Sequence, residues 1–318
     1  MYAAIMIIRL QILELEAGAQ RMTATKFGGL SQGLALALLV VATASAHAAD
    51  EKAGADADGL GDVFGFATPT DTLGNGEREF AQELVGRSGR TGGAYRALDG
   101  KTQLGFGIVD GFSITPGLLS TWAKIDSIAG AQDRSRRVSF NGAVVELKWM
   151  VLDRARNGIG LALLSEPGVS WTDGETGDSV RGRGAEFRVA ADWAMAPGKL
   201  FANVNLAYGL ERTKADGVTE DGSELLASGA VAYRLSDRLF VGAELRYIRA
   251  YDGLGLDDRL GEALYLGPTL FWQPTEKIAV TMTWSPQVWG RDKADPGSSL
   301  DLANFERHQG KLKVAIPF

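Results

Sequence analysis

The feature that most constrains this chain is a long succession of segments, from residue 76 onward, in which apolar and polar residues alternate. In one such segment Leu147 and Trp149 fall on one face, while Glu146 and Lys148 fall on the other. An alternation with period two predicts β-strands with one apolar and one polar face. The chain is therefore expected to be all-β.

The alternating segments predict about twelve strands. Their approximate bounds are residues 76–90, 94–109, 112–125, 138–152, 158–171, 182–195, 200–212, 224–235, 239–251, 261–273, 278–289 and 305–318. Their lengths exceed the five or six residues that are usual in soluble domains, and they reach the roughly 9–11 residues that a tilted strand needs to cross a membrane. The sequence thus predicts a transmembrane antiparallel up-and-down β-barrel over residues 76–318.

The connections between the predicted strands follow a parity. Those after the even-numbered strands are short, whereas those after the odd-numbered strands from the third onward are longer. Outer-membrane barrels have an even number of strands, short periplasmic turns and longer outer loops. The longer connections are therefore expected outside the cell, at residues 126–136, 172–181, 214–222, 252–260 and 290–304.

The last predicted strand has its apolar residues at Leu312, Val314, Ile316 and Phe318. This pattern resembles the C-terminal signature by which bacterial outer-membrane β-barrel proteins are recognised for insertion. The resemblance implies that these four residues act as an assembly signal. It also implies that the barrel-assembly machinery is a partner during biogenesis.

The N-terminal region predicts an exported chain. Residues 22–48 have a basic start, a short apolar core at 34–43 and a small-x-small cleavage site at Ala46-His47-Ala48, as in a secretory signal peptide. Residues 1–21 fit this pattern poorly and are interpreted as an upstream extension with a mis-assigned start. Residues 49–75 are acidic and rich in glycine, and they are predicted to be a flexible periplasmic lead-in, because no apolar pattern supports a plug.

The composition argues against several classes of function. The chain has no Cys and, after the signal peptide, only one His, His308, so a metal site built on these residues is not expected and no cofactor is predicted. Outer-membrane phospholipases resemble this chain in strand number and use a Ser–His pair, but no serine here has a recognisable nucleophile context. The net charge of -6 argues against a nucleic-acid partner. The chain is not expected to be an enzyme.

The polar face of the strands is the best guide to function, because it is expected to face the lumen. Candidate lumen-lining residues are Glu83, Arg87, Asp99, Lys101, Glu146, Lys148, Glu186, Arg188, Asp192, Glu211, Glu224, Arg234, Glu244, Arg246, Lys311 and Lys313. Acids and bases are about equal in number. This balance leaves two interpretations open, a weakly selective channel or an ion-pair network that partly fills the lumen.

Aromatic residues near the predicted strand ends favour a membrane setting. They lie mostly on the apolar face, where they would form the aromatic girdles of a barrel. The residues concerned are Trp149, Trp171, Trp193, Tyr208, Tyr233, Tyr247, Trp272, Trp284 and Trp289.

Over residues 76–318 the chain resembles bacterial outer-membrane β-barrels in general architecture. Small barrels of twelve strands include channels for oligosaccharides and nucleosides, and transporter-like proteins near aromatic-degradation genes. The resemblance implies a passive channel or transporter for small solutes in the outer membrane, with outer-membrane lipid and lipopolysaccharide around it. The alternative is a structural or surface-interaction barrel with a filled lumen, and an outer-membrane enzyme is the weaker third possibility.

Overall fold

The computed structural model describes residues 61–126, 134–135, 138–172, 179–215 and 217–318. The predicted upstream extension, residues 1–21, and the predicted signal peptide, residues 22–48, lie outside the described residues.

The described chain forms one antiparallel sheet that closes on itself. Its strands are β1 (Arg78–Ser88), β2 (Ala94–Val109), β3 (Phe112–Asp126), β4 (Arg134–Ser135), β5 (Ser139–Leu152), β6 (Ile159–Thr172), β7 (Ser179–Ala196), β8 (Leu200–Ala215), β9 (Val218–Ser236), β10 (Leu239–Asp252), β11 (Asp258–Thr275), β12 (Ile278–Asp292) and β13 (His308–Pro317). Strand β1 pairs with β2 on one side and with β13 on the other, and β4 is a two-residue addition to β3. The prediction of an antiparallel barrel of twelve strands is confirmed.

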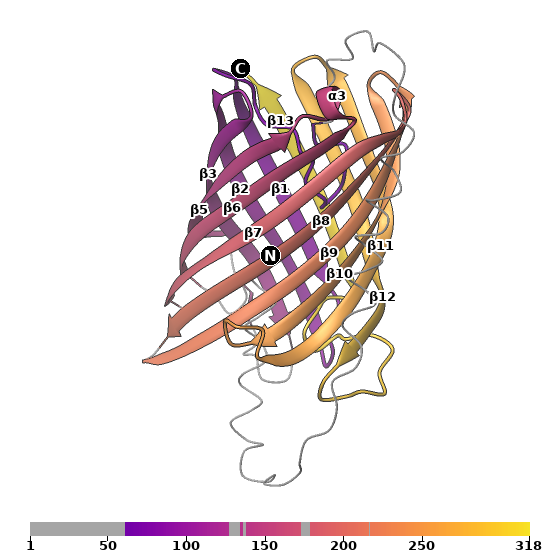
Figure 1. Cartoon of the computed structure of the whole chain (residues 1–318). Coiled ribbons are helices and arrows are strands. Elements are labelled where there is room, and N and C mark those ends of the chain that lie inside the picture. Colours follow the sequence, from indigo (N-terminus) through magenta and orange to yellow (C-terminus); the bar gives the residue numbers. More distant parts are fainter. Residues whose placement is uncertain (1–60, 127–133, 136–137, 173–178, 216) are drawn as a thin grey trace.

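The two ends of the barrel differ, and we call them the turn end and the loop end. Short connections gather at the turn end, including Asp110-Gly111, where Gly111 takes a φ of 85° that suits glycine. The helical turn α3 (Arg154–Asn157) also lies there, capped by Asp153 and Gly158. Figure 1 shows α3 and the C-terminus at the same end, and the connection between β12 and β13 at the opposite end.

The loop end departs from the sequence prediction between β8 and β9. Residues 214–222 were expected to be a loop, but β8 and β9 continue through most of this stretch and leave only residues 216 and 217 between them. The extension is held by Arg212, which donates to both carboxylate oxygens of Asp221 at 2.6 and 2.7 Å. A cross-strand charge pair lets the hairpin continue although its residues are polar. The predicted outer loops 126–136 and 172–181 lie mostly outside the described residues.

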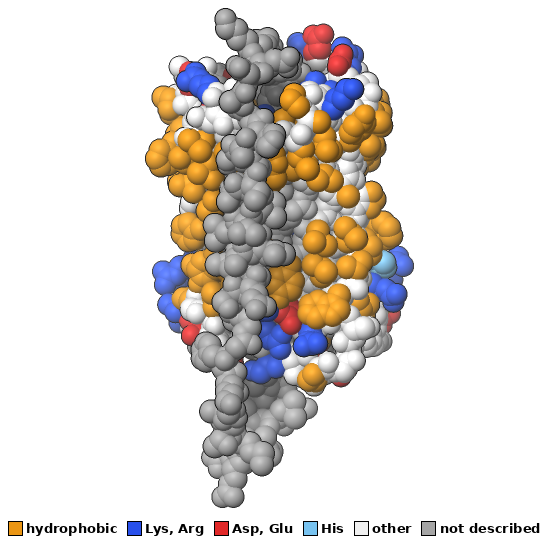
Figure 2. Space-filling model, turned by 45° about the vertical axis from the view of Figure 1, so that its right-hand side comes forward, with side chains coloured by type: hydrophobic (Ala, Val, Ile, Leu, Met, Phe, Trp, Pro, Cys, Tyr) orange, Lys and Arg blue, Asp and Glu red, His pale blue; other side chains and the backbone are white. Residues whose placement is uncertain are grey.

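The sheet exposes its apolar face and buries its polar face, which is the opposite of the arrangement in a soluble protein. Large apolar side chains point outward and are half exposed, such as Val189 at 45% and Leu206 at 49%, whereas Asn205 and Glu244 point inward and are each 1% exposed. Figure 2 shows the apolar side chains as a belt around the visible face, with charged side chains gathered toward both ends. This is the surface of a barrel that lies in lipid.

Aromatic residues on the outer face lie near the ends of the strands. Trp149 and Trp272 are near the turn end, and Trp171 and Trp289 are near the loop end. All four are at least one-third exposed. This placement matches the expected girdles. Among the described residues, no helix is both long enough and apolar enough to span a membrane.

Candidate functional site

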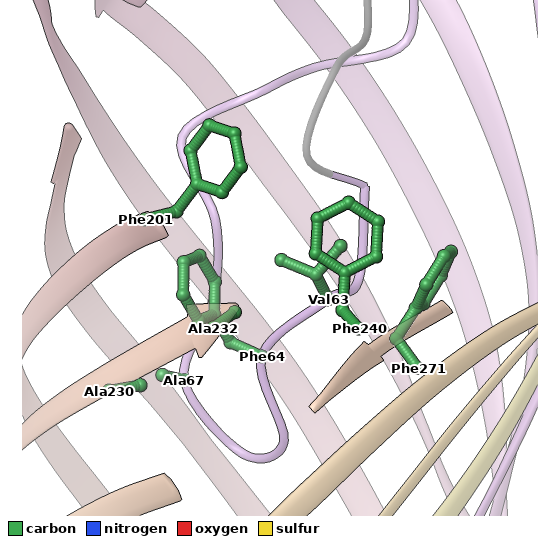
Figure 3. Packing of buried hydrophobic residues seen from close by; sticks show 8 residues of the cluster. All are labelled: Val63, Phe64, Ala67, Phe201, Ala230, Ala232, Phe240 and Phe271. Carbon is green, nitrogen blue, oxygen red and sulfur yellow. The ribbon is translucent and has the colours of Figure 1, made fainter. Parts of the chain in front are cut away.

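Residues 61–75, which we call the inner segment, run inside the barrel. Val63, Phe64 and Ala67 are almost fully buried there. They pack against side chains from β8 to β11, with the aromatic residues in tilted and edge-on contacts (Figure 3). The wall residues in this cluster are Phe201, Ala230, Ala232, Phe240 and Phe271. Burial of one aromatic side chain contributes roughly 1.5–3 kcal/mol, so this cluster is an effective anchor.

Polar groups of the wall satisfy the backbone of the inner segment. Glu244 accepts from the amide of Phe66 at 2.6 Å. Asp192 accepts from the amide and the hydroxyl of Thr70 at 2.7 and 2.9 Å. Asn205 accepts from the amide of Thr68 at 2.7 Å and donates to its carbonyl at 3.1 Å. A segment without secondary structure can be buried only when its amides find such partners.

The inner segment differs from the flexible periplasmic lead-in expected for residues 49–75. Residues 61–75, the described part of the predicted lead-in, lie in the lumen, and residues 49–60 are outside the described residues. The sequence signal was the short apolar run from Val63 to Ala67, which has no strand or helix period. Gly65 within this run permits the close approach, because a Cβ there would lie 2.7 Å from a carboxylate oxygen of Glu244.

Beside the inner segment, on the side of β1 to β7, the lumen contains a cavity of about 520 Å³. Its lining reaches from Ser113, near the turn end, to Thr172 and Val180, near the loop end. We call it the lumen cavity. It follows nearly the whole height of the barrel.

Most of the predicted lumen residues lie on this cavity. Those that line it are Glu83, Arg87, Asp99, Lys101, Glu146, Lys148, Glu186, Arg188, Glu211, Glu224, Arg246, Lys311 and Lys313. The exceptions face the inner segment and its anchor. Asp192 and Glu244 bind the segment's amides, and the guanidinium of Arg234 lies 5.1 Å from the ring centre of Phe240.

Ion pairs connect many of these side chains across the strands. Lys311 contacts Glu83 at 2.8 Å and Arg87 contacts Asp99 at 2.7 Å across neighbouring strands, whereas Arg188 contacts Glu186 at 2.8 Å along β7. Register brings these charges together, because Glu83 on β1 lies directly opposite Lys313 on β13. Lys311 is two residues from Lys313, on the same face of β13. Such pairing lowers the free-energy cost of burying these charges.

The prediction of lumen residues omitted several that the structure brings in. Glu166 forms an ion pair with Lys101 although two strands separate them. Asp62 of the inner segment pairs with Lys313 at 2.5 Å. Glu166 stands on the inward phase of β6, but the following Pro167-Gly168 resembles a turn and hides the alternation. Asp62 lies outside any periodic segment, so no sequence signal marked it.

The connection between β12 and β13, residues 293–307, folds into the loop end, and we call it the closing loop. Phe305 is 1% exposed among apolar residues of β8 to β11, and Glu306 is fully buried. Glu306 accepts from Arg87 at 2.9 Å and from Arg90 at 2.6 Å. Burial alone would raise the pKa of Glu306, but these two guanidinium groups lower it to about 2. The last strand was expected from residue 305 and begins instead at His308, because Phe305 and Glu306 are used as lumen contacts.

His308 stands on the outer face, not in the lumen. Its ring stacks on Trp284, with ring centres 5.8 Å apart, and its Nδ1 has no hydrogen-bond partner within the described part of the chain. No hydrogen bond joins it to a serine in the described part of the chain. Within the same residues, no group of three or more His, Cys, Asp or Glu side chains is arranged to hold a metal ion.

Leu312, Val314 and Ile316 of the expected assembly signal share the outer face of β13, and Phe318 follows its last residue. Leu312 is 38% exposed and Phe318 is 67% exposed. The amide of Phe318 donates to the carbonyl of Arg78 at 3.0 Å, so this residue takes part in joining the last strand to the first.

The sequence of residues 56–318 matches the model of a family described as a family of unknown function, DUF6662. The chain belongs to this family. No curated protein matches the sequence of this chain.

Several solved structures of outer-membrane proteins are similar to this chain. The COG4313 outer membrane channel from Pseudomonas putida F1 is similar with a TM-score of 0.53 and 12% identity, over 78% of this chain and 98% of that chain. The β domain of the Bordetella autotransporter Brka has a TM-score of 0.48 and 14% identity, over 77% and 100% of the two chains. The translocator domain of the autotransporter NalP from Neisseria meningitidis has a TM-score of 0.42 and 17% identity, over 78% and 91%. The closed antiparallel sheet and the similarity to the Pseudomonas channel together show the architecture of an outer-membrane β-barrel.

Proposed function

We propose that this protein is a passive channel for small solutes in the bacterial outer membrane. The observation that carries the proposal is the lumen cavity, which follows nearly the whole height of the barrel beside a fixed inner segment. The apolar belt supports a position in lipid, where lipopolysaccharide and other outer-membrane lipids would surround it. The similarity to a bacterial outer membrane channel agrees with this function. The outward side chains of β13 support a role in recognition by the barrel-assembly machinery.

The inner segment narrows the path without occupying all of it. Its anchor lies against β8 to β11 and the partners of its amides at Phe66, Thr68 and Thr70 lie on β7 to β10, whereas the lining of the cavity comes mostly from β1 to β7. We therefore expect solutes to pass beside the segment while it stays in place. A volume of about 520 Å³ suits solutes of the size that typical ligand sites hold.

The second candidate is a structural barrel with a filled lumen. It is favoured by the ion pair between Lys101 and Glu166 and by the closing loop, whose Glu306 is held by Arg87 and which narrows the lumen at the loop end. An enzymatic function is less well supported, because the imidazole of His308 faces outward and is stacked on Trp284.

Single-channel recording with a reactive thiol in the cavity tests the channel. Thr115 lines the cavity opposite Glu146, and the natural chain has no Cys, so Thr115→Cys introduces one target for a methanethiosulfonate reagent. We expect the protein to conduct in planar bilayers, and modification of this variant to reduce the current. The control is Leu118→Cys on the outer face, where modification should have no effect. Absence of conductance in the parent protein would favour the filled barrel.

A further inference from the structure

Three carboxylates on the lumen cavity have no ion pair and no hydrogen bond among the described residues. Glu224 is only 5% exposed and lies near the loop end of β9. Glu146 lies in the middle of β5, and Glu79 is the second residue of β1, at the turn end. The three acids are thus spread along the height of the cavity instead of being clustered at one point.

The bases on the same lining are almost all occupied. Arg87, Lys101, Arg188, Lys311 and Lys313 each form an ion pair with an acid of the wall, of the closing loop or of the inner segment.

The wall base Arg246 is also engaged, because its guanidinium lies 3.5 Å from the ring centre of Phe66 and donates to Gln309 at 2.8 Å. Arg183 also borders the cavity, but it is an exposed residue of the outer face near the loop end. Only Lys148 remains as a buried base on the lining without a hydrogen bond or ion pair among the described residues.

The charge left over in the cavity is therefore negative. Lys148 is two residues from Glu146 on the same face of β5, so it can offset one of the three free carboxylates and not the others. A buried carboxylate without a partner costs free energy, and a site that keeps such a group gains from a ligand that supplies the missing charge. Narrow paths with walls of one sign concentrate the opposite ion.

We infer that the cavity selects small cationic solutes, with Glu224, Glu146 and Glu79 as successive contacts from the loop end to the turn end. The inference rests on the proposed channel function and names its substrate class. The ligand chemistry is a monovalent inorganic cation or a small amine. The ammonium group of such an amine would supply each carboxylate with the ion-pair partner that the wall does not provide.

Reversal potentials in planar bilayers test this inference on the full-length protein. Under a KCl gradient we expect the parent channel to favour K⁺ over Cl⁻, and the variant E79Q/E146Q/E224Q to lose that preference. Lys148→Gln should shift the potential in the opposite direction, toward stronger cation preference. Glu276→Gln, on an exposed turn outside the lumen, is the matched control and should change nothing. Glu146→Gln alone provides a half-buried, nearly isosteric substitution if the triple variant fails to fold.

A second measurement compares choline with gluconate as the permeant ion, which separates a preference for cations from simple size exclusion. A parent channel that conducts without cation preference, or whose preference survives the triple substitution, would overturn the inference and leave the channel function intact. Absence of any conductance would remove the channel function itself, and this inference with it.

Discussion

Glu306 is the residue on which the closing loop depends most. It is buried and accepts from the side chains of Arg87 and Arg90, which are themselves almost fully buried. Glu306→Gln keeps the shape but removes the charge that both guanidinium groups face. Removal of one partner from a buried pair costs about 3–5 kcal/mol. We expect a lower free energy of unfolding of this size, measured by urea titration in detergent with gel mobility as the signal.

The control for this substitution is Glu276→Gln at the turn between β11 and β12. Glu276 is 90% exposed and 3.8 Å from Arg238, so the loss of this pair should leave stability unchanged. Equal stabilities of the two variants would show that Glu306 is not an anchor of the loop.

Asp301 makes the closing loop sensitive to pH. Burial raises its pKa from 3.8 to about 6, although Asn304 donates hydrogen bonds to it. The folded loop therefore favours the neutral acid. The stability from this preference is fully present below pH 3.8 and is lost as the pH rises through about 6. We expect amide exchange in residues 293–307, corrected for the intrinsic rate, to be less protected at about pH 7.5 than at about pH 5.

Asp301→Asn is the matched variant, because it resembles the neutral acid and cannot ionise. Its loop should show the same protection at both pH values. If the parent and this variant respond alike to pH, Asp301 is not the group responsible.

On the outer face of a strand, the free-energy cost of a charged side chain should depend on its depth in the membrane. Val189 stands between Leu163 and Leu206 of the neighbouring strands, all with outward side chains. Val189→Arg would place a cation in the hydrocarbon and should cost about 2–4 kcal/mol of folding stability. Val218→Arg, at the first residue of β9 near the loop end, should cost only about 0–1 kcal/mol. Refolding yield into lipid vesicles measures both, and similar yields would contradict the assigned membrane face.

The strands were predictable because each one carries its own period. The bounds expected for the second strand, 94–109, are those of β2. The turn at Asp110-Gly111 follows from turn chemistry, and Gly111 has the positive φ that such a turn requires. Alternation also placed most of the proposed lumen residues on the cavity, since it fixes the side of the sheet that each side chain faces.

What alternation could not provide is the identity of each partner. It marks Glu186 and Glu146 equally as inward, yet Glu186 pairs with Arg188 and Glu146 is free of such a pair among the described residues. Lys148 is also two residues from Glu146 on one strand, so the distinction lies in the side-chain conformations and not in the spacing. The inner segment was missed for a related reason. The amides of Phe66, Thr68 and Thr70 bind residues more than 100 positions away, and a segment held by side chains of distant strands has no period of its own.

For the whole molecule, the parity of the connections predicts which end faces the cell exterior. A chain without Cys permits single-residue labelling against no background. Ser299→Cys in the closing loop and Ala155→Cys in α3 both place a thiol at an exposed position, at opposite ends of the barrel. We expect a membrane-impermeant maleimide to label Ser299→Cys on intact cells, and to label Ala155→Cys only after the outer membrane is permeabilised. The reverse pattern would invert the topology.

The long reach of the inner segment has a consequence for the order in which the molecule forms. The carbonyl of Asp62 accepts from Thr281, 219 residues away, and its carboxylate meets Lys313 still later in the chain. Contacts this distant in sequence carry a large loop-closure entropy and slow folding. These contacts cannot form before β12 and β13 are in place. The residues nearest the start of the described chain are therefore among the last to become fully ordered.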